Sequence, residues 1–438
     1  MPSSFPQAAF KFAAAVFLAV IAAFIACGKK SPVPVVDDFK PQQATLSADN
    51  AETQRLLDAI SADSLRSYVA SLAGFETRHS MSDTVAAAKG IGAARRWLRQ
   101  KLQSFSQASG GRLQVYYDDF TTTICGATTT QRNVVARLPG TASPERQILV
   151  SGHYDSRTTD RCDGQGFAPG ANDDASGTAG VLELARVLSR HQFKATILFI
   201  AFTGEEQGLF GSRHYAATAR QRGDNIIAMT TNDIIGNIRG GSGTIDSAGV
   251  RCFSDDPMNS PHRQLARYLK LQAEAYVPNF AVRLILARDR PGRGSDHFSF
   301  YEQGYTAVRL IEPEDNLDQQ HSPNDLIRFM SFSYHRKVVQ VNAAFVASLA
   351  WAPATPNGVT SEKLGAGRYR LRWNPSSDAA KYLVALRQSA SVSYDSLFDA
   401  GSKTEVTLAA VATPAYISVA AVDAQQNESL FSTEVLLE

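Results

Sequence analysis

The chain has 438 residues, of which 44% are hydrophobic and 20% are charged. This composition is typical of globular proteins, and the length allows a large core and a second domain. There are 44 basic and 42 acidic residues, so the formal net charge is only +2. Because no block of like charges could follow a phosphate backbone, the sequence argues against a nucleic acid partner.

The first 27 residues have the layout of an export signal. Lys11 precedes an uncharged apolar run over residues 12–26, which is too short for a comfortable membrane span. The run ends at Cys27 in a pattern that resembles the cleavage site of bacterial lipoproteins, where the cysteine carries the lipid. We therefore predict an exported lipoprotein of the periplasm or cell envelope, attached to a membrane through Cys27. Plain secretion and an uncleaved anchor are the alternatives.

Residues 28–49 lack an apolar period and predict a tether, and residues 50–352 predict an α/β domain. In this domain short apolar runs alternate with helical patterns, which indicates a mixed central sheet with helices on both faces. The predicted helices cover residues 80–104, 176–188, 209–220 and 331–349. The predicted strands cover residues 133–138, 147–152, 195–203, 226–231, 282–286 and 307–311.

A composition change at residues 351–356 predicts a boundary, after which residues 355–438 show the alternating pattern of a small antiparallel sandwich. Trp373 and the apolar run over residues 415–422 resemble those of a fibronectin type III module. The module contains no ionisable cluster that suggests chemistry. We expect it to have its own core, to serve spacing or adhesion, and to be dispensable for catalysis.

Three cysteines follow the predicted signal, and none forms a CxxC pair that would suggest a thiolate metal site. We predict a disulfide between Cys125 and Cys162, which leaves Cys252 unpaired.

The residues with chemical potential stand at the ends of predicted strands or in a tight turn. His153 and Asp155 end one strand and point to the same side, because strand side chains alternate with a period of two. A histidine can bind a metal while a nearby carboxylate holds its other ring nitrogen, although an ordinary hydrogen-bonded pair has the same spacing. Asp173 and Asp174 lie in a glycine-rich turn before a helix, where they could cap that helix or present a bridging metal ligand.

Glu205 and Glu206 directly follow a buried strand, at the edge where open α/β sheets bind ligands. Neighbouring side chains diverge, so one glutamate could bind a metal while the other takes a proton from water. Asp233 follows another strand, and His321 precedes the last helix. Together these residues offer the nitrogen and oxygen ligands that zinc accepts.

Six segments resemble, in order and spacing, the bacterial secreted di-zinc aminopeptidases, a family that also includes glutaminyl cyclases and glutamate carboxypeptidases. The strings are GHYDS, PGANDDASG, FTGEEQGLFGS, ND at residues 232–233, GSDHFSF and HSPND, and the resemblance covers about residues 70–350. It implies the zinc aminopeptidase fold and two zinc ions, with the five metal ligands His153, Asp173, Glu206, Asp233 and His321.

In that resemblance Asp173 bridges both ions, His153 and Asp233 bind one, and Glu206 and His321 bind the other. Glu205 matches the general base and Asp155 the carboxylate partner of His153. Asp296 matches a position near the substrate. Several family members have a tyrosine directly before the last histidine ligand, whereas this chain has Gln320.

The function that follows is hydrolysis of the N-terminal bond of peptide substrates, by a monomer in which two zinc ions share a water of lowered pKa. A glutaminyl cyclase uses nearly the same ligands and is the first alternative. A catalytically silent binding protein on the same fold is the second.

Overall fold

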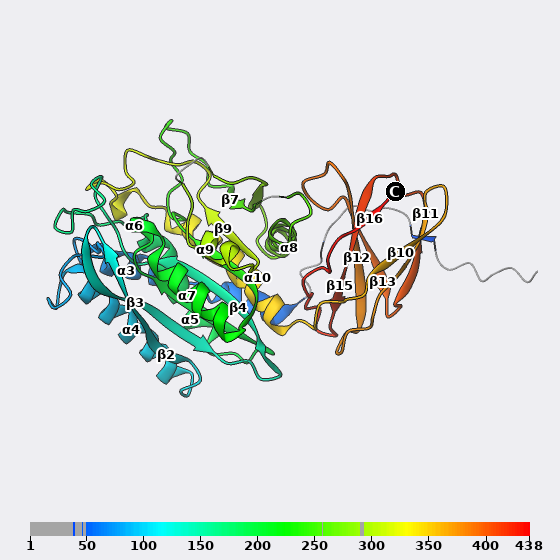
Figure 1. Ribbon diagram of the computed structural model, residues 1–438, viewed down its shortest axis with the longest axis horizontal. Helices are drawn as coiled ribbons and strands as arrows, with labels where there is room; N and C mark the ends of the chain where they lie inside the picture. The colour runs from blue at the N-terminus through cyan, green and yellow to red at the C-terminus, as the bar shows by residue number, and fades with distance from the viewer. Residues whose placement is uncertain (1–37, 40–45, 47–49, 256, 290–292) are drawn as a thin grey trace, which may run out of the picture.

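The computed structural model describes residues 38–39, 46, 50–255, 257–289 and 293–438. The predicted signal and its Cys27 lie outside these residues. No helix in the described part of the chain is long and apolar enough to cross a membrane. Figure 1 shows a larger α/β body beside a smaller body made of strands. We call residues 50–352 the α/β domain and residues 355–438 the sandwich.

The α/β domain is built on a mixed sheet in the order β2-β3-β5-β4-β6-β9-β7-β8. At its centre, β4 pairs in parallel with β5 and with β6, and β6 pairs in parallel with β9. The hairpin β2–β3 joins β5 in the antiparallel direction. The strands are β2 (Gln114–Ile124), β3 (Ala127–Leu138), β4 (Ser143–His153), β5 (Ala195–Phe202), β6 (Asn225–Asn232), β7 (Gly249–Phe253), β8 (Ala281–Ile285) and β9 (Ala307–Ile311).

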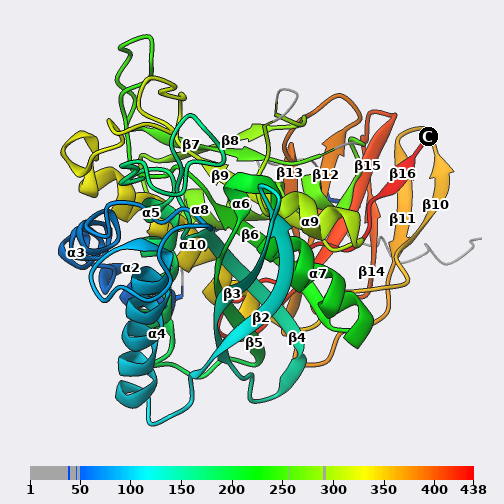
Figure 2. The ribbon, with the colours of Figure 1, turned by 60° about the vertical axis from the view of Figure 1, so that its left-hand side comes forward.

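Helices cover both faces of this sheet, as the alternation of apolar runs and helices predicts (Figure 2). On β4, Ile148 and Val150 enter the core on one face, and Leu149 enters the core on the other. The first face carries α2 (Ala51–Asp58), α3 (Ala62–Ala73), α4 (Gly90–Ala108), α5 (Ala175–Leu188), α8 (Pro261–Tyr276) and α10 (Phe332–Trp351). The second carries α7 (Phe210–Arg222) and α9 (His297–Glu302).

One predicted helix begins later than the sequence suggests. The pattern predicts a helix from residue 80, but α4 begins at Gly90. The Asp83 carboxylate accepts the backbone N–H groups of Val85 and Ala86, and this local turn competes with helical hydrogen bonding. The apolar pattern therefore predicts a helix that is too long at its N-terminal end.

The structure pairs Cys125 with Cys162, as predicted, and leaves Cys252 buried without a disulfide. This bond joins the tip of the β2–β3 hairpin to the loop after β4. That loop carries Arg157 and Arg161, which reach the end of the sheet where β4 and β5 finish.

The sandwich consists of two four-stranded sheets. One contains β10 (Thr360–Gly365), β11 (Arg368–Arg372), β14 (Glu405–Leu408) and the short β1 (Asp38–Phe39), which pairs in parallel with β14. The other contains β12 (Lys381–Gln388), β13 (Ser396–Gly401), β15 (Ala415–Val422) and β16 (Val435–Leu437). Apolar side chains between the sheets, including Leu371, Val384 and Val419, form a core of the module's own.

The outer face of the β12–β15 sheet packs against the α/β domain and extends that domain's core. Leu383 and Ala420 belong to the same buried cluster as the helices of the α/β domain. The Glu428 carboxylate accepts hydrogen bonds from Gln272 Nε2 at 2.9 Å and Ser348 Oγ at 3.2 Å. The sandwich therefore has one core of its own and shares a second with its neighbour.

We expect a chain that ends at Ala352 to melt at a lower temperature than the full chain, or to aggregate. Its truncation would expose the apolar surfaces of α8 and α10 that the sandwich covers. Calorimetry and light scattering would measure this, with a chain that lacks residues 1–37, and so keeps β1, as the control. An unchanged melting temperature after removal of the sandwich would show that the shared face contributes nothing to stability.

Candidate metal centre

The centre lies where the parallel strands of the sheet end. His153 is the last residue of β4, and Asp233 directly follows β6. Glu205 and Glu206 follow β5 after Gly204, whose φ of 69° is a left-handed conformation that glycine adopts without strain. Because β4 pairs in parallel with both β5 and β6, their carboxyl ends meet and bring these four side chains together.

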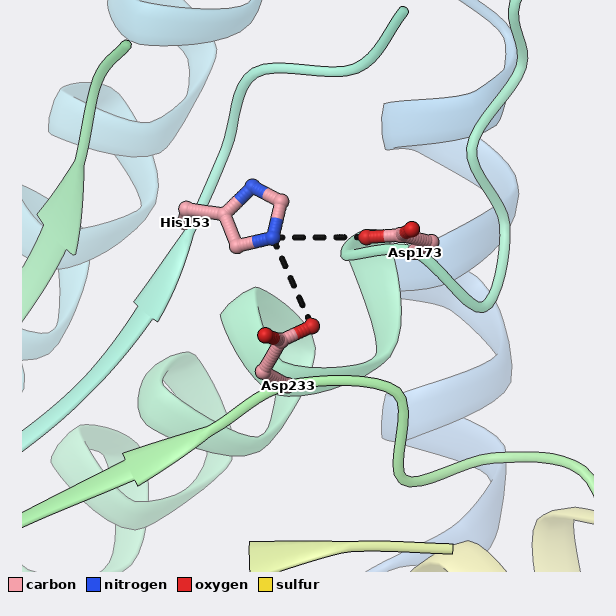
Figure 3. Close-up of side chains that lie close together, drawn as sticks. All are labelled: His153, Asp173 and Asp233. Carbon is pink, nitrogen blue, oxygen red and sulfur yellow. Dashed lines mark ion pairs between the residues drawn. The ribbon is translucent and has the colours of Figure 1, made fainter. Parts of the chain in front are cut away.

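Two groups of possible ligands form here, and they share Asp173. In the first group, His153 Nε2 lies 3.3 Å from Asp173 Oδ1 and 3.5 Å from Asp233 Oδ1 (Figure 3). In the second, His321 Nε2 lies 3.1 Å from Asp173 Oδ2 and 3.2 Å from Glu206 Oε2. Each oxygen of Asp173 thus faces a different histidine, and each group could hold one metal ion.

The burial and charge of these side chains fit divalent cations. His153, Asp173, Asp233 and Glu206 are all buried. Asp233 Oδ1 and Glu206 Oε1 are buried without a hydrogen-bond partner among the described residues, and a buried carboxylate oxygen in that state is costly. Histidine nitrogens and carboxylate oxygens are the donors that zinc accepts. The residues present therefore fit two zinc ions that share one carboxylate.

The two histidines carry much of the charge balance in the metal-free protein. Burial lowers the pKa of His153, but the surrounding carboxylates, Glu205 foremost, raise it well above its usual range. Burial likewise lowers the pKa of His321, yet Glu206 and Asp173 raise it to about 10. The surrounding carboxylates therefore favour the protonated form of both imidazoles. Because zinc binds neutral imidazole, metal binding should release protons.

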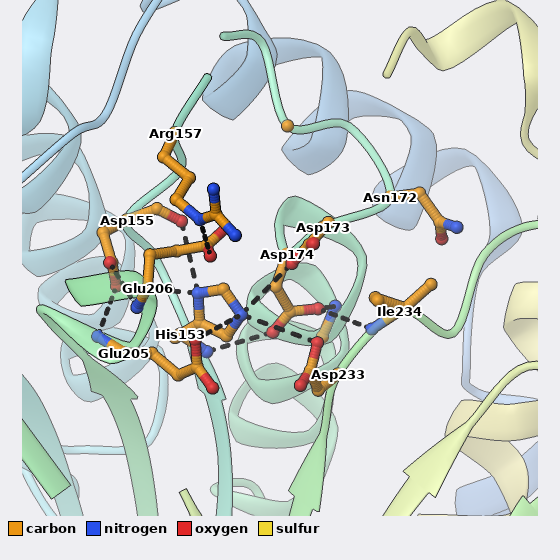
Figure 4. Close-up of polar contacts among 12 residues, drawn as sticks. His153, Asp155, Arg157, Asn172, Asp173, Asp174, Glu205, Glu206, Asp233 and Ile234 are labelled. Carbon is orange, nitrogen blue, oxygen red and sulfur yellow. Dashed lines mark hydrogen bonds and ion pairs between the residues drawn. The ribbon is translucent and has the colours of Figure 1, made fainter. Parts of the chain in front are cut away.

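Asp155 connects His153 to the two glutamates (Figure 4). Its Oδ1 lies 3.5 Å from His153 Nδ1, on the side of the ring away from Asp173. The same carboxylate accepts the backbone N–H groups of Glu205 at 3.2 Å and Glu206 at 3.1 Å. One side chain thus orients a histidine ligand and the turn that presents the glutamates.

Glu205 lines the cavity beside the centre, with its Oε2 4.0 Å from His153 Nε2. It belongs to neither group of possible metal ligands. Asp296 is fully buried and does not line the cavity, so its predicted contact with substrate stays a prediction. Gln320 is also buried away from the cavity lining, and its side-chain amide has no hydrogen-bond partner among the described residues.

Two carboxylates that hold the ligands in place were not assigned this role from the sequence. The Asp325 carboxylate accepts the backbone N–H groups of Asn172 and Asp173, both at 2.8 Å. Asp174 caps α5 and also accepts the backbone N–H groups of His153 at 3.0 Å and Ile234 at 3.2 Å. The pair Asp173–Asp174 therefore divides its work between possible metal binding and joining three segments of the site.

A buried arginine fixes the loop that leads into Asp173. The Arg78 guanidinium is fully buried and donates to the carbonyl oxygens of Tyr154, Pro169 and Gly170. Nothing in the local sequence around Arg78 indicates this role, because these three carbonyl groups lie more than 70 positions away.

Comparison with known proteins places this centre in a family. The family model described as "Peptidase family M28" matches residues 133–346. A protein of Leptosphaeria maculans named "Probable zinc metalloprotease" is 35% identical over 394 residues, which covers 82% of this chain and 91% of the relative. A protein of the same name from Pyricularia oryzae is 36% identical over 344 residues, which covers 71% and 68%.

Solved structures share the fold at low sequence identity. The LapA aminopeptidase of Legionella pneumophila has a TM-score of 0.56 at 21% identity, covering 72% of this chain and 78% of that one. A glutaminyl cyclase of Porphyromonas gingivalis has a TM-score of 0.53 at 19% identity, covering 66% and 98%. The fold, the ligand set and the relatives together define a zinc metallopeptidase. Within that class, the chain belongs to peptidase family M28, and its substrates are peptides.

Asp325→Asn should weaken zinc binding by about 10–100-fold, the usual cost of losing a group that holds a metal ligand in place. Asparagine keeps the shape but replaces one acceptor with a donor, so one of the two N–H groups at residues 172 and 173 loses its partner. Competition with a chromogenic chelator would measure the affinity.

The matched control is Asp318→Asn, an exposed residue of the same loop. If both variants bind zinc as tightly as the unmodified protein does, Asp325 has no part in positioning Asp173.

Proposed function

We propose that this chain is an exported aminopeptidase that binds two zinc ions and removes the N-terminal residue of peptides. The observation that carries the proposal is the shared Asp173 carboxylate, with one oxygen toward His153 and the other toward His321. Such sharing is what a pair of adjacent metal ions requires. Bound zinc would polarise the scissile carbonyl and lower the pKa of a water molecule.

The chain's own groups then have separate tasks. Glu205 lines the cavity beside both ligand groups without belonging to either, so it is placed to take a proton from the attacking water and pass it to the leaving amine. Asp155 fixes the position of His153 relative to the turn that carries Glu205 and Glu206. Arg157 donates to Glu206 Oε2 at 2.8 Å and so holds that ligand from the loop after β4.

A glutaminyl cyclase and a catalytically silent binding protein are the two alternatives, and each would use the same residues differently. Solved structures with this fold include both aminopeptidases and glutaminyl cyclases, so the fold does not separate hydrolysis from cyclisation. The curated relatives are named zinc metalloproteases, which favours hydrolysis. A silent binding protein would have no need of Glu205 together with five possible ligands.

Export, attachment through a lipidated Cys27, and a monomeric state remain part of the proposal. The signal-like run over residues 1–27 supports the first two. The acyl mass of the purified protein would test them.

Glu205→Gln should lower kcat/KM on an aminoacyl p-nitroanilide by about 10²–10⁴-fold, because it removes the proton carrier. Zinc content should stay the same, since no ligand is changed. His321→Ala is the counterpart, and it should lower the zinc content measured by elemental analysis. A Glu205→Gln enzyme with a near-normal rate would rule out this residue as the base.

A further inference from the structure

A cavity of about 380 Å³ opens beside the two ligand groups, and its lining is rich in arginine. Besides ligand residues and Glu205, it is lined by the apolar side chains of Leu209, Ile234 and Phe298. Five arginines complete the wall: Arg157, Arg161, Arg213, Arg293 and Arg309. A cavity that only had to accept a cationic N-terminus would not favour so many guanidinium groups.

Two of these arginines are engaged with the ligand carboxylates. Arg157 Nε lies 2.8 Å from Glu206 Oε2, and Arg309 Nη2 lies 3.1 Å from Asp233 Oδ2. A cation bound in each ligand group would neutralise part of the negative charge of these same carboxylates. With zinc bound, the positive charge of the arginines that line the cavity would therefore exceed the remaining negative charge of the carboxylates.

Arg161 has a different task, because its Nε and Nη2 both donate to the backbone carbonyl of Glu206, at 3.2 and 3.0 Å. It holds the glutamate turn from the disulfide-linked loop. Its charge adds to the field in the cavity, but its donors are largely committed.

Arg213 and Arg293 are the least committed members of the wall. The Arg213 side chain is 54% exposed, and its Nε lies 3.8 Å from Glu302, a surface pair worth little. Arg293 is only 13% exposed and lies 3.6 Å from Asp315 and 3.8 Å from Asp289, both beyond hydrogen-bond length. Its Nε and Nη2 have no hydrogen-bond partner among the described residues.

Neighbouring elements carry these two side chains. Arg213 lies in the first turn of α7, Arg293 lies just before α9, and α7 packs against α9. A planar guanidinium matches a carboxylate with two parallel hydrogen bonds, which a neutral amide of the same shape cannot accept in full.

We propose that Arg213 and Arg293 bind a carboxylate of the substrate, so that the enzyme prefers peptides with an acidic group next to the scissile bond. This inference rests on the proposed peptidase function. Two sources share the chemistry: the side chain of an N-terminal glutamate or aspartate, and the α-carboxylate of a C-terminal residue.

The first test compares the p-nitroanilides of glutamate and glutamine, which differ in charge but hardly in shape. The zinc-loaded full chain should hydrolyse the glutamyl compound with a kcat/KM at least about tenfold higher, the range of one charge-assisted hydrogen bond. Arg293→Gln and Arg213→Gln should each reduce this ratio several-fold. The matched control is Arg190→Gln. This exposed arginine lies between α5 and β5, where β5 begins, whereas the metal centre lies where β5 ends.

A second arm uses N-acetylalanyl-glutamine and its C-terminal amide. Discrimination here, with none between the two p-nitroanilides, would assign the arginines to the C-terminal carboxylate. In that case carboxylate binding stands, and the aminopeptidase proposal fails.

Calorimetry with L-glutamate and L-glutamine gives a readout that does not depend on turnover. The zinc-loaded protein should bind glutamate at least about tenfold more tightly, and Arg293→Gln should remove most of that difference. If none of the substrates is cleaved but glutamate binds selectively, the peptidase proposal fails and the carboxylate site remains. Equal affinities and equal rates for the acidic and neutral compounds would overturn the inference.

Discussion

The shared carboxylate of Asp173 is the constraint on which the rest of the site depends. For its two oxygens to face two histidines, the turn after Gly170 must hold Asp173 in one place. Asp325 accepts the backbone N–H of Asp173, and Arg78 binds the carbonyl of Gly170. Buried side chains from distant parts of the chain thus fix one carboxylate. The crowding of negative charge around Asp173 needs nearby positive charge, which the arginines Arg157 and Arg309 supply in part and bound cations would supply further.

Sequence reasoning located the parts of this centre that are local. An apolar strand that ends in a polar residue can be recognised by itself, so His153, Glu206 and Asp233 could be placed at one sheet edge. The contacts that support the ligands join residues far apart in the sequence, and for that reason the roles of Asp325 and Arg78 were not predicted. The same limit applies to the fold. The six strands predicted in the α/β domain match β3, β4, β5, β6, β8 and β9 to within a few residues, except that β3 begins six residues earlier. The strands β2 and β7, the helices α2, α3, α8 and α9, and the face shared by the sandwich and the α/β domain were not predicted. In β12, Leu383 enters the core shared with the α/β domain and Val384 enters the core of the sandwich. Such an apolar run predicts a buried strand but does not indicate what covers its second face.

The arginine wall adds a second layer of electrostatics to the metal centre. The ligand groups concentrate negative charge at the floor of the cavity, and the arginines surround it with positive charge. Without cations the two layers partly neutralise each other, as the contacts of Arg157 with Glu206 and Arg309 with Asp233 show. With cations bound, less of the carboxylate charge would face the arginines, and the positive charge of the wall would favour a substrate anion at Arg213 and Arg293. Metal binding and substrate preference are in this view coupled through the same carboxylates.

The central claim is that Asp173 is shared by two zinc ions, and anomalous diffraction at the zinc edge from crystals of the zinc-loaded protein tests it most directly. The account predicts two peaks, one among His153, Asp173 and Asp233 and the other among Asp173, Glu206 and His321. Their separation should be about 3.5–4 Å, as in other two-metal sites. A single peak, or two peaks of which one lacks Asp173 as a ligand, would contradict the account.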